Sequence, residues 1–256
     1  MNFLDKKYLN LLREIVVTQF KLKDQSTFFG FMWSFLNPLV MLLVLLIFFR
    51  LRIGDQVEHY GIYLLIGIIH YTHFANTTNA SMNILSRMRQ LTCNAVFPKE
   101  LLVVGSVISN TIEFGISMLI CLPIAYFSGV RLFWSIGLLP LVFLLQIMMV
   151  LWVSFILASV YVFVRDIGHI YQVFLRVLFF TTPIFYTAAF FGAGIAKYVV
   201  LLNPLAHLIT FSRNLIIDGN VFSVKLFALF LLANALCTYA GFKLFKKCEP
   251  KFAEYA

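Results

Sequence analysis

The chain has 256 residues, of which 61% are hydrophobic and only 12% carry a charge. Because soluble globular domains are about 25% charged, this composition excludes a soluble fold and predicts a membrane protein. The net charge of +9 does not indicate nucleic-acid binding, since Lys and Arg accumulate in the cytoplasmic loops of membrane proteins. Long continuous apolar runs disfavour a membrane β-barrel, so we expect an all-α polytopic bundle that forms one transmembrane domain over residues 1–256.

Residues 4–23 combine basic side chains with apolar residues at helical spacing, among them Leu9, Leu12, Val16 and Phe20. This pattern predicts an amphipathic helix that lies in the lipid headgroup region. A soluble helix packed on a partner is the alternative. A helix needs roughly 20 apolar residues to cross a bilayer, and the predicted spans are 28–49, 60–81, 101–125, 140–162, 168–186 and 222–242.

Prolines and segment lengths set several boundaries. Asn37-Pro38 predicts a kink in the middle of the first span. Residues 132–164 are uncharged and too long for one crossing, so we expect the fourth span to begin near Pro140 after an interfacial lead-in. Asn203-Pro204 starts a helix too short to span a bilayer. Residues 187–220 are therefore predicted to form short re-entrant or interfacial helices.

Six spans place both termini on the same side of the membrane. The 20 basic residues divide unevenly, with thirteen on the side of the termini, six on the other side and Arg176 within a span. The positive-inside rule therefore predicts that the termini and residues 83–100 are cytoplasmic. We expect a soluble partner to act on this polar segment, which contains Arg87, Arg89, Phe97, Pro98, Lys99 and Glu100.

Polar side chains at membrane depth face the bundle interior or a water-filled path, rarely lipid. The second span carries Thr72, Asn76 and Asn79 on one stripe, with His70 and His73 close by. The two histidines are one helical turn apart, but no Cys or carboxylate stands near them in sequence. Hydrogen bonding inside the bundle is therefore favoured over a metal site.

Two further ionisable groups lie near the middle of predicted spans, Glu113 and Arg176. A charge at this depth is costly, so each needs a partner or water. Pairing between the two is one possibility that the sequence leaves open. A proton relay is the weaker alternative, because relays use several acids.

Aromatic residues make up 17% of the chain and gather in two places. Lipid-facing packing is one interpretation, although Phe is not an interfacial residue by preference. Because flat rings suit the apolar faces of sugars, we expect some of them to line a path. The two groups are Phe31, Trp33 and Phe35 in the first span, and Phe179, Phe180 and Tyr186 at the end of the fifth.

The chain lacks sequence motifs for its own catalysis. No GxxxxGK[ST] segment occurs, so the phosphate-binding loop of an ATPase is missing. The four cysteines show no metal-ligand spacing. A membrane glycolipid transferase, the alternative from another class, would need clustered acids or a metal motif at a membrane face. Only Asp166 lies near the cytoplasmic face of a span, apart from Glu100. We expect no bound metal or cofactor.

Four groups of residues follow one another along the chain. They are Gly30-Phe31-Met32-Trp33-Ser34-Phe35-Leu36-Asn37-Pro38, then Ala95-Val96-Phe97-Pro98-Lys99-Glu100, then Arg165-Asp166-Ile167-Gly168-His169-Ile170 with Thr182-Pro183-Ile184-Phe185-Tyr186, and last Leu202-Asn203-Pro204-Leu205 with Arg213. In this order they resemble the type-2 ABC export permeases for polysaccharides. Each motif alone is weak, whereas the ordered set is specific and covers nearly the whole chain. Phe29, where the family often has Leu, is a mild departure.

The resemblance implies a permease of the O-antigen or capsule exporters in a bacterial inner membrane, with a lipid-linked glycan as substrate. Such a permease pairs with itself and with two copies of a separate ATPase subunit, which would bind ATP and Mg²⁺. Export of a teichoic acid, a lipid or a drug is the alternative. The resemblance also implies that residues 83–100 couple to the ATPase together with Arg165 and Asp166. Spans one, two and five would line the path, and residues 187–218, with Asn203, Pro204 and Arg213, would gate its outer end.

Overall fold

The computed structural model describes residues 6–24, 32–53, 57–94, 97–187, 198 and 202–255. Every regular element in these ranges is a helix, in agreement with the predicted all-α bundle. The elements are α1 (Lys6–Asp24), α2 (Trp33–Ile53), α3 (Tyr60–Arg87), α4 (Arg89–Asn94), α5 (Glu100–Phe127), η3 (Trp134–Leu138), α6 (Leu139–Phe163), α7 (Ile167–Thr181), α9 (Pro204–Arg213), η5 (Asn214–Asp218), α10 (Val224–Cys248), η6 (Glu249–Lys251) and α11 (Phe252–Tyr255).

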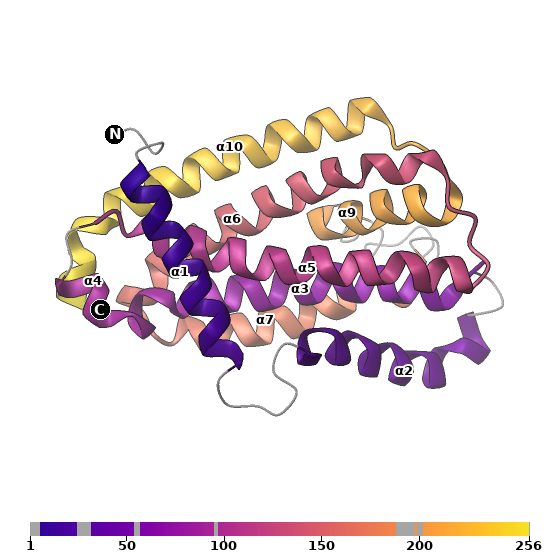
Figure 1. Ribbon diagram of the computed structural model, residues 1–256, viewed down its shortest axis with the longest axis horizontal. Helices are drawn as coiled ribbons and strands as arrows, with labels where there is room; N and C mark the ends of the chain where they lie inside the picture. The colour runs from indigo at the N-terminus through magenta and orange to yellow at the C-terminus, as the bar shows by residue number, and fades with distance from the viewer. Residues whose placement is uncertain are drawn as a thin grey trace.

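Helix α3 lies at the centre of the bundle and contacts α2, α5, α6, α7 and α9. Figure 1 shows the long helices running along one axis, with α10 on the outer side of α6. The apolar first half of α3 is enclosed on all sides, which places the main core around it. A second core joins α1, the start of α5 and the end of α10.

Helix α1 is amphipathic, as predicted, and crosses α5 obliquely (Figure 1). It buries Ile15, while Lys6, Lys7, Arg13 and Lys21 are exposed. The crossing is close because Gly105 of α5 has no side chain. A Cβ atom at this position would lie 2.6 Å from Cγ2 of Ile15. The apolar face of α1 thus packs on the bundle itself, and its location in the headgroup region stays a prediction.

Each predicted span has a helix in its place, namely α2, α3, α5, α6, α7 and α10. Three segments of the described chain are long and apolar enough to cross a bilayer: Glu100–Phe127, Trp134–Phe163 and Val224–Lys251. Helices α2 and α7 hold shorter apolar stretches, Phe35–Arg50 and Ile167–Thr181. The chain is therefore a multi-pass membrane protein, while the count of six crossings stays a prediction.

Several helices continue through polar residues beyond the ends of the predicted spans. Helix α3 extends to Arg87 and α10 to Cys248, so part of the predicted loop 83–100 and of the basic tail is helical. Helix α2 extends to Ile53, and Pro38 lies in its second turn rather than in the middle of a span. Lys and Arg are good helix formers, so a change from apolar to basic residues does not end a helix.

Helix α7 ends at Thr181, short of the predicted end of the fifth span at residue 186. Thr182 adopts an extended conformation with φ −86° and ψ 133°, as is usual for a residue before proline. Pro183 then offers no N–H to continue the helix. The 15 residues of α7 reach about 22 Å, which is less than the roughly 30 Å of a bilayer core.

Two helices start where proline predicts a start. The 3₁₀ turn η3 precedes α6, which begins at Leu139 with proline in its first turn. Asn203 caps α9 by accepting a hydrogen bond from the backbone N–H of Leu205 at 3.0 Å, with Pro204 next to it. Gly219, at a φ of 67°, ends the following π-helical turn η5, since glycine tolerates this left-handed conformation.

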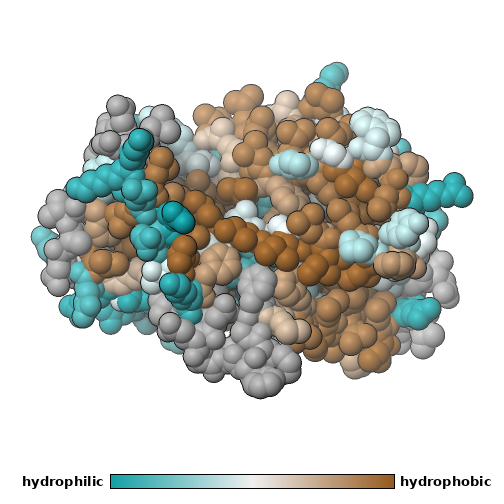
Figure 2. Space-filling model, in the orientation of Figure 1, coloured by the Kyte–Doolittle hydropathy of each residue, from teal (hydrophilic) through white to brown (hydrophobic). Residues whose placement is uncertain are grey.

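The surface separates into an apolar body and polar ends. Figure 2 shows hydrophilic residues gathered at the end of the bundle where α1 and α4 lie, with a smaller group at the opposite end. Hydrophobic residues cover much of the surface between them. This distribution is typical of a bundle whose long axis crosses a bilayer.

We predict that Gly105→Leu displaces α1 from α5. The added side chain would meet Ile15, and overpacking of this kind costs typically about 1–3 kcal/mol. A lower midpoint of thermal unfolding in detergent, with faster proteolysis of α1, would show the effect. Gly115→Leu in the same helix is the control, because a Cβ atom there has nothing within 4 Å. Equal behaviour of the two variants would contradict the docking.

Candidate functional site

One end of the bundle collects the side chains predicted to meet an ATPase. Helix α3 ends there, α4 follows, and the chain turns at residues 97–99 into α5 (Figure 1). The corner between α6 and α7 lies at the same end. Leu91 of α4 adds an apolar side chain that is 44% exposed. The exposed charged residues at this end include Arg87, Arg89, Arg165 and Asp166.

Glu100 is not part of this exposed surface. Its side chain is buried and forms an ion pair with Lys246 of α10, with Nζ 2.6 Å from Oε1. Lys246 also contacts Oε2 of Glu249 at 2.9 Å, and Oε1 of Glu249 accepts a hydrogen bond from the backbone N–H of Lys99 at 3.0 Å. The carboxylates of Glu100 and Glu249 therefore connect the start of α5 to the end of α10. Any role of Glu100 in coupling would act through this attachment.

Aromatic side chains also join α10, α11 and the end of α6 at this end of the bundle. Phe252 of α11 is buried against Phe245 of α10, with ring centroids 5.1 Å apart. Phe163, the last residue of α6, contacts Phe252 and Tyr255. Helix α11 also packs on α4. The segment 83–100 and the corner at Arg165 are thus joined through the C-terminal helices, whose participation the sequence analysis missed.

The segment that follows α7 forms a second cluster of hydrogen bonds with α3 and α9. Arg213, at the end of α9, donates hydrogen bonds from Nη1 to the carbonyl oxygen of Pro183 at 2.7 Å and from Nη2 to that of Ile184 at 2.9 Å. Tyr60 donates to the carbonyl of Phe185 at 2.8 Å. Tyr63 donates to the next carbonyl, that of Tyr186, at 3.0 Å. Four successive carbonyls are therefore bound by three side chains.

The guanidinium group of Arg213 is held from several directions. It donates from Nε and Nη2 to the carbonyl of Tyr63 at 3.1 and 2.9 Å, and lies over the Tyr63 ring at 3.3 Å. A Cβ atom at Gly67 would lie 2.8 Å from Nη2, so glycine leaves the room that the guanidinium needs. Asn203 donates to Oγ1 of Thr182 at 2.8 Å. The predicted gate residues thus meet residues 182–186, while gating itself stays a prediction.

A buried hydrogen-bonded network confirms the role predicted for the histidines. Nδ1 of His70 lies 3.2 Å from Oε1 of Gln146, and Nε2 lies 2.8 Å from Oγ of Ser212. Nε2 of Gln146 lies 3.2 Å from Nδ1 of His73. Within the described ranges, no group of three His, Cys, Asp or Glu residues suits a metal ion. Gln146 was missed, although it is the one amide in the uncharged run of residues 132–164.

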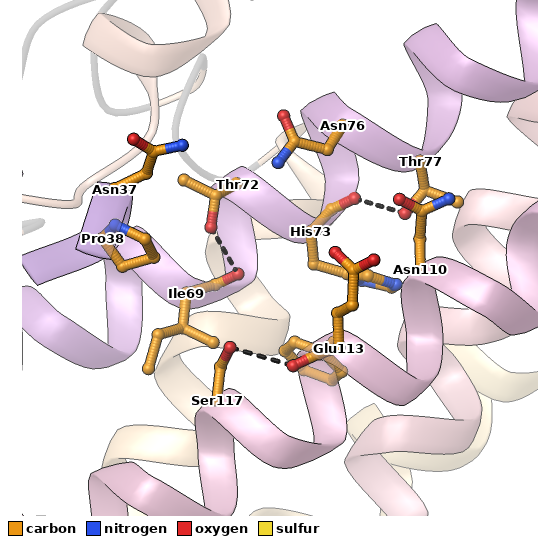
Figure 3. Close-up of a pocket in the computed structure, with 11 residues that line it drawn as sticks. Asn37, Pro38, Ile69, Thr72, His73, Asn76, Thr77, Asn110, Glu113 and Ser117 are labelled. Atoms are coloured by element: carbon orange, nitrogen blue, oxygen red, sulfur yellow. Dashed lines mark hydrogen bonds between the residues drawn. The ribbon is translucent and has the colours of Figure 1, made fainter. Parts of the chain in front are cut away.

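A polar cleft opens between α2, α3 and α5. Figure 3 shows the carboxylate of Glu113 pointing from α5 into this cleft, beside Asn76 and Asn110. The predicted residues Thr72, Asn76 and Glu113 are therefore brought together. The full lining is Asn37, Pro38, Ile69, Thr72, His73, Asn76, Thr77, Asn110, Glu113, Phe114 and Ser117.

Other predicted intramembrane residues lie elsewhere. Oδ1 of Asn79 accepts a hydrogen bond from Gln172 of α7 at 3.0 Å. Arg176 is exposed on α7 and does not line the cleft, so it and Glu113 occupy different sites.

The aromatic residues that were predicted to line a path differ in their exposure. Phe179 and Tyr186 are buried, with exposed fractions of 9% and 2%, whereas Phe180 is 64% and Trp33 44% exposed. Phe35 is half-buried beside an apolar hollow between α2, α3 and α5, and Phe31 falls outside the described residues. That these rings line a path between two copies of the chain stays a prediction.

The sequence model of the family described as "ABC-2 type transporter" matches residues 10–217. Curated relatives match over nearly their whole length. A protein of Myxococcus xanthus named "O-antigen export system permease protein RfbA" is 25% identical over 249 residues, which cover 97% of this chain and 96% of the relative. Two Klebsiella pneumoniae proteins of the same name are 24% identical over 247 residues, covering 96% of this chain and 94% of each relative.

We predict that Arg213→Met destabilises the bundle by about 3 kcal/mol, because it leaves buried carbonyls without donors. Thermal unfolding in detergent would measure the loss. Arg213→Lys should recover only part of it, since an ammonium group cannot reproduce the planar fork of the guanidinium. Arg131→Met, at an exposed position after α5, is the control. Near-native stability of Arg213→Met would show that the carbonyls do not need this side chain.

We also predict that Lys246→Met costs about 2 kcal/mol. The substitution leaves the buried Glu100 carboxylate without its cation, a loss that is reduced here because Lys246 is partly exposed. The adjacent Lys247→Met removes the same charge from an exposed position and should be nearly neutral. The double variant Glu100→Gln with Lys246→Met should regain stability relative to Lys246→Met. Additive losses in this cycle would disprove the ion-pair interaction.

Proposed function

The chain belongs to the ABC-2 type transporter family, and on this basis we propose that it is the membrane-spanning subunit of an ATP-driven exporter for a lipid-linked polysaccharide. The observation that carries the proposal is the near full-length match to relatives named as O-antigen export permeases. The order of motifs from Trp33 to Arg213 supports the same assignment. ATP hydrolysis then takes place on a separate subunit, since the chain has no phosphate-binding loop of its own.

We place the end formed by α4, α11 and the α6–α7 corner in the cytoplasm of a bacterium, against the ATPase. Three observations support this orientation. The basic residues at the ends of α3, α4 and α10 gather there, as the positive-inside rule requires of a cytoplasmic side. Leu91 lies exposed on α4, two residues after the exposed Arg89, and an apolar anchor with a polar rim is typical of interfaces. The inner membrane is the expected location.

In this proposal, ATP-driven movement of the ATPase pushes on α4 and the turn at residues 97–99. The Glu100–Lys246–Glu249 cluster passes the displacement to α10, because fastened helices move together. At the opposite end, the segment held by Arg213 gates the outlet. Two copies of the chain enclose the path, and apolar side chains exposed on α2 and α7, such as Val44, Ile47, Val173 and Val177, supply surfaces for the second copy or for lipid.

The test is co-purification of the chain with an ABC ATPase subunit and ATP-dependent appearance of polysaccharide outside the cell. We predict that the double variant Arg89→Ala with Leu91→Ala weakens the complex by about tenfold or more, as truncation of interface anchors commonly does. Dissociation of the labelled ATPase from the chain in nanodiscs would be measured.

The matched control replaces Arg131 and Leu132, which are also an exposed basic and apolar pair but follow α5 at the opposite end. This variant should bind the ATPase normally. A loss of binding in the control and not in the α4 variant would reverse the orientation. Failure of the unmodified chain to bind any ABC ATPase would refute the proposed function.

A further inference from the structure

Helix α7 carries a row of polar side chains on a face that the chain itself leaves open. His169, Gln172 and Arg176 follow one another at intervals of three and four residues, so they lie on one side of the helix. All three are exposed, whereas the buried residues of α7 lie on another side. This polar row therefore points away from the core of the bundle.

The polar row continues onto α3, which packs beside α7 (Figure 1). Gln172 donates from Nε2 to Oδ1 of Asn79 at 3.0 Å, and Asn76, on the preceding turn of α3, is exposed. Polar side chains within membrane spans face the bundle interior or a water-filled cavity rather than lipid. Because the row faces outward from this chain, we expect it to line a space that a second molecule helps to enclose.

Arg176 lies at a depth where its charge decides what this face can contact. The exposed pair Arg165 and Asp166 comes directly before α7, and Arg176 is nine residues after the first helical residue, Ile167. The rise of a helix places Arg176 about 14 Å further along, close to half of the roughly 30 Å of a bilayer core. An arginine in the middle of a span is costly against lipid tails and marks a water-filled path.

The described part of the chain supplies no counter-ion for this group. Among the described residues, Arg176 forms neither an ion pair nor a hydrogen bond. Glu113, which lies near the middle of α5, points into the cleft between α2, α3 and α5 (Figure 3), and Arg176 does not line that cleft. The guanidinium group is therefore open to an anion from outside this chain.

The donors of the polar row favour an oxyanion as the ligand. A guanidinium group binds phosphate or carboxylate through two parallel N–H bonds and has no acceptor for a hydroxyl proton. Gln172, one turn before Arg176, uses one N–H for Asn79 and retains a second N–H as a donor. A cation that has no carboxylate beside it selects a negatively charged group over a neutral sugar.

We propose, resting on the export function above, that Arg176 is an anion-binding residue on the path between two copies of the chain. It holds a phosphate or carboxylate group of the substrate as the substrate passes, and Gln172 supplies a further donor. Export then requires a negative charge on the transported molecule. This charge lies either in the link between the lipid and the sugars or on the sugars themselves.

The first measurement tests whether the charge of Arg176 lies in an aqueous path. Phe180→Cys places a thiol one turn after Arg176, at a side chain that is 64% exposed. The full chain is studied in phosphatidylcholine nanodiscs, with Cys237, an exposed native cysteine, replaced by Ala. The rates of labelling by an anionic and a cationic water-soluble methanethiosulfonate are compared by peptide mass spectrometry.

We expect Arg176→Gln to lower the ratio of the anionic to the cationic labelling rate about tenfold. A unit charge about 6 Å from the thiol acts on the two reagents with opposite sign. Arg176→Lys should keep the ratio, because it keeps the charge.

The second measurement identifies the ligand by protection of the same thiol. Dodecyl phosphate, dodecyl glucuronide and dodecyl glucoside are added before a neutral methanethiosulfonate. An anionic probe at about four times its dissociation constant should slow labelling about fivefold, because about a fifth of the sites stay empty. Dodecyl glucoside should not protect, and Arg176→Gln should abolish protection by the anions.

The pattern of protection separates the two sources of the charge. Protection by dodecyl phosphate alone assigns the charge to the lipid link, and protection by dodecyl glucuronide alone assigns it to the sugars. Protection by both shows that Arg176 accepts either oxyanion.

Leu232→Cys is the matched control, since this side chain of α10 is 62% exposed on an apolar face with Leu229 and Leu236. It should not be labelled. Equal labelling of Leu232→Cys and Phe180→Cys would contradict a path at α7, as would a complete lack of labelling at Phe180→Cys. The anion site is refuted if Arg176→Gln leaves the rate ratio unchanged, if dodecyl glucoside protects as well as the anions, or if no probe protects.

A carboxylate of the second copy is the competing partner for Arg176. In that case Glu113→Gln would expose the positive charge, raise the ratio of anionic to cationic labelling and refute a substrate anion as the partner. Both measurements use the chain without an ATPase, so their failure would leave the export function standing. Conversely, a chain that shows the anion site but binds no ABC ATPase would refute the export function alone.

Discussion

The structure depends on the requirement that backbone polar groups at membrane depth be satisfied within the protein. Pro183 prevents α7 from continuing, and the carbonyls that follow have no helical partners. Arg213, Tyr60 and Tyr63 supply the missing donors. Helix α9 must therefore lie beside the first turns of α3, and α3 must have glycine at position 67 to admit the guanidinium.

The opposite end of the bundle meets a similar requirement with charges. A buried carboxylate is tolerated only with a cation and hydrogen bonds, and Glu100 receives Lys246 from α10. This contact makes the end of α10 part of the surface at which α4 and the α6–α7 corner lie. The two clusters hold opposite ends of the central helices. The polar cleft of Glu113 lies between the clusters along α5.

Local signals in the sequence predicted the helical class, the position of each long helix, the start of α6 near Pro140 and the cap of α9. Such signals lie within a few residues of the feature that they determine, as Asn203 and Pro204 do. The extension of α3 and α10 into charged segments was not predicted, because basic residues resemble loop residues in composition yet favour helix. The partners of Tyr60, Gln146 and Glu100 were not predictable. They lie 125, 76 and 146 residues away in the chain, and one sequence contains no information on such distances.

Polarity at membrane depth does not by itself identify a transport path. The polar residues of the second span divide into two kinds once their partners are known. His70 and Asn79 bond to side chains of other helices, and these bonds hold the bundle together. Thr72 instead bonds within its own helix, and its remaining lone pair faces the cleft that Asn76 and Glu113 also line. Thr77 and Ser117, which line the same cleft, likewise donate to carbonyls of their own helices. A sequence stripe of Thr and Asn thus predicts where a bundle is polar, whereas the hydrogen-bond partners decide which of these side chains join one helix to another.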